Sequence, residues 1–408
     1  MPLNSVGIVT SRDGFVYSFD EATLSARITD FLNPLKSDDI VRDKYLDSRD
    51  KLPVDTVRGL LRHEPRADSK FVRCLYRPFD TRTLFYHDAM IERSRREVML
   101  NMLTGENLGL LATRQTRDQW DVFVTMVVTG HKSLSAYDIT SLFPLYVYPN
   151  RVLAMSHQTS LFPTEQNQKG EREANLAPAF IADATAHLGL TFILDGAGDL
   201  QQTFGPEDVF HYIYAVLHSP SYRSRYAEFL KIDFPRIPIT TDLDLFRALC
   251  SRGAALVRIH LLTSPALSHR TVGFPIPAAN GENLVEAGHP RYVAPGENDP
   301  ESGEPVETGR VYISKGNPKT GMRGQYFEGV PADIWEFHVG GYQVCEKWLK
   351  DRRGRTLNFD DITHYQKIIG ALGETLRLMG EIDAAIDERG GWPLAGSEGE
   401  TAVSTEVN

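Results

Sequence analysis

The sequence lacks the features of a membrane or secreted protein. No run of about 18 apolar residues occurs among its 408 residues, so no membrane-spanning helix is predicted. Residues 1–14 lack a basic segment followed by an apolar core, so no secretory signal is predicted. Only three cysteines occur, Cys74, Cys250 and Cys345, far apart and odd in number. They are most simply buried thiols in a reducing compartment, and we expect a cytoplasmic protein.

Several motifs of well-known chemistry are also missing. There is no His-Glu-x-x-His pair for zinc, no Gly-x-Ser-x-Gly elbow for a nucleophilic serine and no Gly-x-x-x-x-Gly-Lys-Ser/Thr loop for ATP. A glycine-rich turn, residues 195–199 (DGAGD), follows the apolar stretch 190–194, but Gln201 stands where a third glycine would fall. We interpret it as a tight turn rather than a cofactor loop. His211 and His218 are seven apart, a spacing more typical of packing than of metal binding.

What is present is an ordinary globular composition with a negative balance of charge. Hydrophobic residues make up 41% of the chain and charged residues 24%, and the formal net charge is -10. A chain of this length holds two or three cores. We expect a mixed α+β fold of two or three subdomains, with short mixed sheets, flanking helices and a long C-terminal helix.

Changes of composition divide the chain into six parts. We expect an N-terminal α/β part at 1–163, a linker or exposed crossover at 164–178, a mainly helical part at 179–277, a long Gly/Pro/Glu-rich loop at 278–309, strands and two helices at 310–389, and a disordered tail at 390–408.

Helices are predicted where a start signal precedes apolar residues at three- and four-residue spacing. The clearest are 206–218 and 358–387, the first opened by Pro206 and the second by Asn358. Others are expected at 93–103, 219–232 and 242–262. Strands are expected at 108–112, 122–128, 142–148, 310–314, 325–328 and 334–339, with a turn at Asn317-Pro318 and Gly321.

The most informative stretch is 340–355, reading GGYQVCEKWLKDRRGR. Val344 and Trp348 lie four apart, as residues on one helical face do, and Gly354 follows as a helix stop. Five cations crowd nine positions with a single acid among them: Lys347, Lys350, Arg352, Arg353 and Arg355. The stretch predicts a short helix that offers cations at its C-terminal end. Because the helix macrodipole favours such cations whatever the function, a purely structural role stays open.

The same block resembles the C-terminal specificity region of type ISP restriction–modification enzymes. Other segments share the likeness in the same order: 7–19 (GIVTSRDGFVYSF), 76–87 (YRPFDTRTLFYH), 105–114 (GENLGLLATR), 142–149 (LFPLYVYP) and 203–238. These blocks span nearly the whole chain and several are long, so the resemblance is specific.

The resemblance implies recognition of a double-stranded DNA sequence in phage defence. The family's adenine methylation and ATP-dependent cleavage would belong to other parts, so S-adenosylmethionine, ATP and Mg are implied for the complete enzyme and no cofactor for this chain. Residues 33–36 and 317–320 lack the second proline and the aromatic of an adenine methyltransferase loop. We expect no catalysis here, and expect as partners duplex DNA and the methyltransferase, helicase and nuclease portions of the same enzyme or of a split subunit.

Further candidate DNA contacts lie in the first half of the chain. Three arginines beside Ser94 are the most available to phosphate: Arg93, Arg95 and Arg96. A polar group next to Trp120 could read base edges: Arg114, Gln115 and Arg117. In YRPFDTR, by contrast, ion pairs of Asp80 with Arg77 or Arg82 are the better interpretation.

Two other classes of function stay open. The chain could be an enzyme with an unrecognised site, built around acids such as Asp195, Asp199, Glu207 and Asp208. Residues 68–70, Asp-Ser-Lys, also carry half of a metal-nuclease signature, which is common by chance. Alternatively, the chain could be a scaffold of a phage-defence complex that docks partners through the apolar stripe of residues 358–387.

Overall fold

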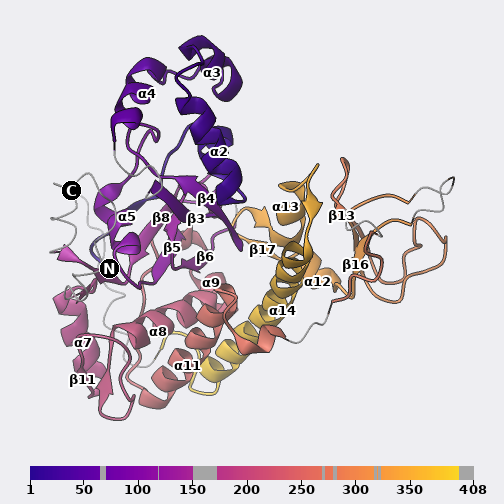
Figure 1. Cartoon of the computed structure of the whole chain (residues 1–408). Coiled ribbons are helices and arrows are strands. Elements are labelled where there is room, and N and C mark those ends of the chain that lie inside the picture. Colours follow the sequence, from indigo (N-terminus) through magenta and orange to yellow (C-terminus); the bar gives the residue numbers. More distant parts are fainter. Residues whose placement is uncertain are drawn as a thin grey trace, which may run out of the picture. The chain divides into compact units, whose positions relative to one another are not determined.

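The computed structural model describes residues 1–64, 70–117, 119–149, 172–268, 272–278, 283–316, 319 and 323–394. They form two compact units (Figure 1). Unit 1 comprises Met1–Phe210 and Glu228–Arg236, and unit 2 comprises His211–Ala227 and the chain from Ile237 onward. The predicted mixed α+β class, with short sheets and a long C-terminal helix, is confirmed.

Unit 1 is built on two four-stranded sheets. The first has the order β1-β8-β5-β6, all antiparallel, with β1 Ser5–Val6, β8 Thr140–Pro144, β5 Gly109–Thr113 and β6 Val122–Thr125. The second has the order β2-β4-β3-β7, with β2 Tyr17–Ser18, β4 Asp80–Phe85, β3 Phe71–Arg77 and β7 Val128–Thr129, the last parallel to β3. Every residue of β5 and β6 is buried, as their apolar composition requires.

Helices and two small sheets complete unit 1. The helices are α1 Asp13–Val16, α2 Glu21–Leu32, α3 Asp38–Tyr45, α4 Val54–His63, α5 Arg96–Leu103 and α7 Pro178–Leu188. The small sheets pair β9 Tyr146–Val147 with β10 Glu173–Ala174, and β11 Thr191–Phe192 with β12 Thr203–Phe204. Helices α8 Pro206–His218 and α10 Ala227–Leu230 span the division between the units.

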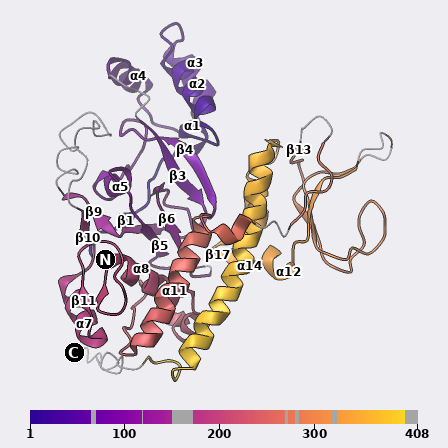
Figure 2. The ribbon, with the colours of Figure 1, turned by 60° about the horizontal axis from the view of Figure 1, so that its bottom comes forward.

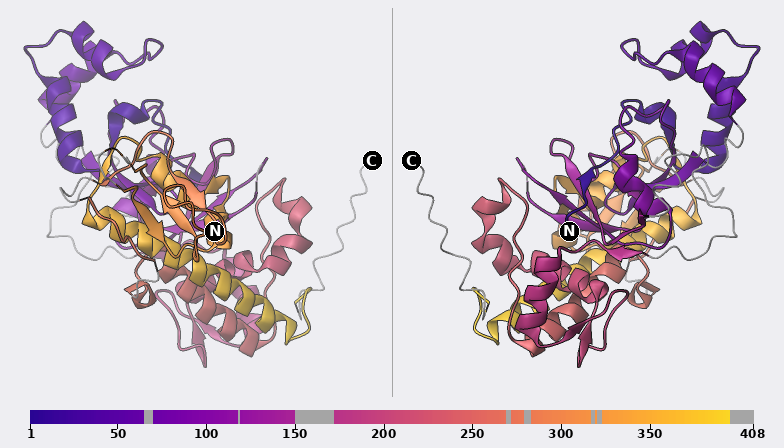
Figure 3. Two further views of the ribbon diagram at one scale, coloured as in Figure 1. Left: turned by 90° about the vertical axis from the view of Figure 1, so that its right-hand side faces the viewer. Right: turned by 90° about the vertical axis from the view of Figure 1, so that its left-hand side faces the viewer.

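Helices α2, α3 and α4 were not predicted, although each of the first two begins at a capping side chain. Asp20 accepts a hydrogen bond from the Thr23 amide, and Ser37 from the Ile40 amide. Leu24, Ile28 and Phe31 then bury one face of α2. The three helices group at one end of unit 1 (Figure 3, indigo to purple).

Unit 2 is mainly helical around a long helix. Its helices are α9 Pro220–Arg225, α11 Leu243–His260, the 3-10 turn η2 Pro265–Ser268, α12 Ala332–Trp335, α13 Val344–Lys350 and α14 Phe359–Asp387. Its strands form three small sheets: β13 Asn283–Leu284 with β19 Thr356–Leu357, β14 Arg291–Val293 with β15 Arg310–Tyr312 and β16 Tyr326–Glu328, and β17 His338–Val339 with β18 Tyr342–Gln343.

Helices α11 and α14 lie side by side (Figure 2) and form the core of unit 2. Leu249 and Leu256 of α11, and Leu372 and Ile382 of α14, are inaccessible to solvent. Asn358 caps α14 through a reciprocal bond with Asp361, as predicted. The apolar stripe of α14 therefore packs within its own unit, which disfavours the docking interpretation.

Several predicted elements differ from the structure. The helix expected at 93–103 begins at Arg96, because Arg95 has a left-handed backbone with φ of 56°. The segment 219–232 forms two short helices, and within 334–339 only His338–Val339 is a strand, since Ile334 lies in α12. The segment 278–309 contains strands β13 and β14.

Parts of other predictions lie outside the described residues: 164–171 of the linker, 317–318 and 321 of the turn, and 395–408 of the tail. The described start of that tail is packed. The Trp392 indole nitrogen donates to Ser221 Oγ at 2.9 Å, and its ring lies 5.3 Å from that of Tyr222.

Candidate nucleic-acid interface

The Arg93–Arg96 segment is a hydrogen-bonded turn in unit 1. Val9 and Arg93 exchange backbone hydrogen bonds of 3.1 and 3.0 Å, and Tyr86 donates its hydroxyl to the Ser94 carbonyl at 2.7 Å. Arg95 then starts α5 without a side-chain cap. A cleft of about 480 Å³ lies over this turn, lined by residues 3–5, Asp88 and 91–98.

Acids stand beside two of these three arginines. Arg93 is 61% exposed with its Nε 4.0 Å from Glu92, and Arg96 Nη1 lies 2.8 Å from Asp88 Oδ2. Burial raises the pKa of Asp88, but bonds from Ser94 and Arg96 outweigh it and lower the pKa overall. Arg95 Nε is buried and has no hydrogen-bond partner among the described residues. The cleft is thus lined by Arg95, whose Nε has no partner among the described residues, and by Arg93 and Arg96, which lie beside acids.

The polar group near Trp120 forms an exposed loop after β5. Asp138 fixes it by accepting from the Thr116 hydroxyl at 2.8 Å and from the Arg117 amide at 3.1 Å. Trp120 is buried, whereas the side chains of Arg114, Gln115 and Arg117 face solvent. Arg114 Nε lies 3.0 Å from Asp233 Oδ1, in a pair exposed on both sides. In the part of the chain that the structure describes, no hydrogen bond involves the side chains of Gln115 or Arg117, so this loop offers free donors.

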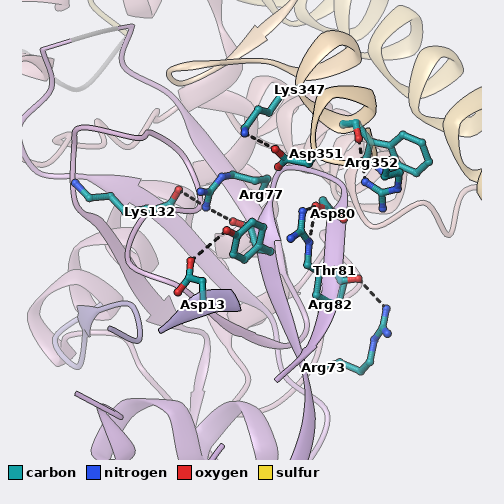
Figure 4. A network of polar contacts seen from close by, with 12 residues as sticks. Asp13, Arg73, Arg77, Asp80, Thr81, Arg82, Lys132, Lys347, Asp351 and Arg352 are labelled. Atoms are coloured by element: carbon teal, nitrogen blue, oxygen red, sulfur yellow. Dashed lines mark hydrogen bonds and ion pairs between the residues drawn. The ribbon is translucent and has the colours of Figure 1, made fainter. Parts of the chain in front are cut away.

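The basic helix α13 is present as predicted, but it ends at Lys350 with Asp351 as its C-cap, and Gly354, at φ of 76°, lies at the end of the turn that follows. Two of its cations pair with acids one turn away: Lys347 with Asp351, and Lys350 with Glu346 at 2.7 Å. Figure 4 shows the first of these pairs.

Arg352 is the cation whose placement departs from the sequence prediction. It is 6% exposed, its guanidinium carbon lies 3.4 Å from the centre of the Trp348 ring, and its Nη1 donates to the Trp348 carbonyl at 3.1 Å. Such a side chain presents no surface to a phosphate in this conformation. Arg353 is exposed and donates to the His289 carbonyl, while Arg355 is half-buried.

The arginines of the YRPFDTR segment are structural, as interpreted from the sequence. Arg82 pairs with the buried Asp80 at 2.7 Å, and Arg77 donates to the carbonyls of Tyr76 and Lys132 at 2.7 and 3.0 Å (Figure 4). The Arg82 guanidinium also lies 3.8 Å from the centre of the Tyr76 ring. These contacts hold the turn between β3 and β4.

The glycine turn at 195–199 uses its amides internally. Gly196 N–H donates to the Tyr146 hydroxyl at 2.9 Å, and Gly198 N–H donates to Asp208 Oδ2 at 2.6 Å. Asp199 Oδ1 accepts from the amides of residues 201–203. Because these amides already have partners, the turn does not fit a phosphate or an S-adenosylmethionine, and the tight-turn interpretation is supported.

The remaining candidate chemical groups are also engaged in packing. Lys70 is 2% exposed and paired with Glu64, while Asp68 and Ser69 lie outside the described residues. His218 is buried and bonded to the Tyr214 carbonyl at 2.7 Å. No group of three or more His, Cys, Asp or Glu among the described residues could hold a metal ion. The three cysteines are buried thiols, as predicted. No described helix is long and apolar enough to cross a membrane.

Comparison with known proteins decides the family. The model of the type ISP C-terminal specificity domain matches residues 1–381. The chain belongs to this family. No curated protein sequence matches it significantly.

Solved structures resemble this specificity domain in fold. They include a DrdV–DNA complex (20% identity, TM-score 0.63), a nuclease-deletion mutant of the type ISP restriction–modification enzyme LlaGI with a DNA substrate mimic (16%, 0.60), and the ATP-dependent type ISP enzyme LlaBIII bound to DNA (16%, 0.61). Each match covers 93% of this chain but only 35%, 27% and 23% of the DrdV, LlaGI and LlaBIII chains, respectively. The chain thus spans about a third or less of the length of these proteins.

Sequence reasoning missed the residues that position the candidates in this specificity domain. Asp138, which fixes the loop carrying Gln115 and Arg117, lies 21 residues from Arg117, and no spacing links the two. The contact of Arg352 with Trp348 had a visible signal, because the two residues are four apart and side chains at that spacing meet near a helix end.

Proposed function

We propose that this chain recognises a double-stranded DNA sequence as the target-recognition part of a type ISP restriction–modification enzyme. The family match over residues 1–381 carries the proposal, and the presence of DNA in the three similar structures supports it. The complete enzyme would add adenine methyltransferase and ATP-dependent endonuclease parts, and these would bind S-adenosylmethionine, ATP and Mg. The chain itself would bind DNA in the cytoplasm without catalysing a reaction.

The exposed loop after β5 is the strongest candidate for reading bases. A glutamine amide suits adenine and an arginine guanidinium suits guanine in the major groove. Gln115 and Arg117 are exposed and Asp138 anchors the backbone between β5 and β6. An anchored loop keeps its direction on binding, so less conformational entropy is lost.

Phosphate contacts would come from cations whose present partners are easily exchanged. Arg93 and Arg96 face exposed or half-exposed acids, as do Arg114 and Lys350. Exposed pairs of this kind contribute about 0–1 kcal/mol, so a phosphate can replace the acid at little cost. The remaining candidates for phosphate contact are Arg95, Lys347, Arg353 and Arg355. Arg352 is left out because of its burial.

Substitutions in the loop separate base reading from phosphate contact. We expect Gln115→Ala to relax the preferred DNA sequence at one position, with a loss of roughly 1–3 kcal/mol for the best site. Selection from a randomised duplex pool, with the methyltransferase portion supplied, measures this preference. If Arg117 contacts phosphate instead, Arg117→Ala weakens all sequences alike and reduces the salt slope by about one.

Arg377→Ala is the matched control for charge. Arg377 is 52% exposed on α14 and pairs with Glu374 and Glu381, outside all candidate segments. Its removal changes the net charge as Arg117→Ala does. Folded loop variants that select the wild-type sequence with wild-type affinity would contradict the assignment of this loop.

A further inference from the structure

Exposed apolar side chains gather around the candidate base-reading loop of unit 1. Asp138, which fixes this loop, lies between Tyr137 and Ile139, which are 71% and 51% exposed. Helix α10 and the turn after it add Phe229 and Ile232, which are 70% and 63% exposed. Single exposed apolar residues are ordinary, whereas a group of them marks a contact surface. The polar side chains of the loop therefore stand in an apolar surrounding.

A backbone hydrogen bond places Ile232 beside Gln115. The Thr116 amide donates to the Lys231 carbonyl at 3.3 Å. This bond joins the peptide group between residues 115 and 116 to the peptide group between residues 231 and 232. Gln115 and Ile232 are therefore neighbours, and both side chains are exposed.

The backbone that carries Ile232 is fixed on both sides. The amides of Ile232 and Asp233 both donate to the Phe229 carbonyl at 3.1 Å. Asp233 also pairs with Arg114 of the loop, its Oδ1 lying 3.0 Å from Arg114 Nε. The apolar side chain is thus presented by an ordered turn, which lowers the entropy lost when it meets a partner.

The major-groove edge of an A·T base pair matches these two neighbouring side chains. Adenine presents its N7 acceptor and N6 donor to a glutamine amide, and thymine presents its C5 methyl group on the same edge. A branched apolar side chain suits that methyl group. A G·C pair carries no methyl group in the groove.

We propose that Gln115 and Ile232 together read one A·T base pair. The Gln115 amide bonds the adenine, and Ile232 contacts the methyl group of the thymine paired with it. This assignment rests on the proposed recognition of double-stranded DNA and adds Ile232 as a residue that determines specificity.

Replacement of thymidine by deoxyuridine tests the proposal, because it removes only the methyl group. The full chain, with the methyltransferase portion supplied, first selects its preferred duplex, and each A·T pair of that duplex is then changed in turn. At the position that Gln115→Ala relaxes, deoxyuridine should weaken wild-type binding about fourfold, the effect of one buried methyl group. Ile232→Ala should bind the two duplexes equally, whereas Ile232→Val should keep most of the difference.

Ile40→Ala is the matched control. Ile40 is 55% exposed on α3, outside all candidate segments, so this variant should lose affinity for the deoxyuridine duplex as the wild type does. Substitutions at such exposed positions have little effect on stability, and thermal melting checks that each variant is folded.

Sequence-selective binding without this pattern would overturn the assignment of Ile232 and leave the proposed function standing. Such results are equal wild-type binding of both duplexes, a loss that persists in Ile232→Ala, or a Gln115→Ala variant that relaxes no A·T position. If Ile232→Ala weakens all sequences alike, the side chain inserts between base steps, which also contradicts the reading of a methyl group. A wild type without any sequence preference would overturn both proposals.

Discussion

Arg117 and Arg352 were both predicted to contact DNA, Arg117 at base edges and Arg352 at phosphate, yet their surroundings differ. Arg117 is exposed on a loop that Asp138 holds by its backbone. Arg352 is 6% exposed and lies flat on Trp348. The sequence supplies an arginine in both places, and the neighbouring side chains decide whether its charge reaches solvent or stabilises the fold.

Burial at single residues also predicts a dependence of stability on pH. His218 is 3% exposed, and burial, assisted by the nearby Arg223, lowers its pKa to about 3. The unfolded chain binds this proton at its ordinary pKa of about 6.5. The contribution of His218 is therefore present above pH 6.5 and is lost as the pH falls toward 3. Between pH 7 and pH 5 the free energy of unfolding should fall by roughly 2 kcal/mol from this residue.

Guanidinium denaturation at pH 7 and pH 5 measures this contribution of His218 to the free energy of unfolding. His218→Gln should show a smaller pH dependence than the wild type by that amount, and His63→Gln, which changes a solvent-facing histidine, should show the wild-type dependence. An unchanged pH dependence in His218→Gln would mean that this histidine is not held neutral by burial.

At the scale of elements, helix α13 and the turn after it (residues 351–354) hold one cation that stabilises the fold and one that lies at the surface. We expect Arg352→Ala to lower the free energy of unfolding by about 2 kcal/mol, because it removes the stacking on Trp348 and the bond to its carbonyl. Lys350→Ala should change it by less than about 0.5 kcal/mol, since it breaks an i,i+4 pair at the surface. Urea denaturation compares the two. Equal free energies of unfolding for the two variants would mean that Arg352 contributes no more to folding than a surface cation such as Lys350.

Elements with strong local signals were predictable from the sequence. Asn358 and Asp242 stand directly before α14 and α11 and cap them, and Pro206 is the first residue of α8. Helices α2 and α3 have comparable signals in Asp20 and Ser37, which sequence reasoning passed over because their apolar faces are short.

Long-range pairing was not predictable. Strand β1 pairs with β8 across more than 130 residues, with Ser5 opposite Leu142. No spacing in the sequence encodes that register, which depends on burial in the assembled sheet. The candidate DNA contacts also depend on parts of the chain that are far apart in the sequence. Their basic residues were visible in the sequence, whereas their exposure and their acidic partners depend on segments far away in the chain.

For the whole molecule, the net charge of -10 sets the conditions for any contact with DNA. An acidic chain can bind a polyanion only through local groups of cations, and each described unit contains at least one such group. Binding should therefore be weak for the chain alone and should depend strongly on salt, because every phosphate contact releases condensed counterions. Long-range repulsion from the other acids is screened beyond about 10 Å at 0.1 M salt.

The central claim is tested most directly by the affinity of the full chain for a fluorescent DNA duplex, measured by anisotropy across a range of salt concentrations. The account predicts saturable binding at low salt, with the logarithm of the association constant falling linearly against the logarithm of salt concentration. The slope should be about -0.9 for each phosphate contacted. No binding at low salt, or an affinity that salt does not change, would contradict recognition of DNA by this chain.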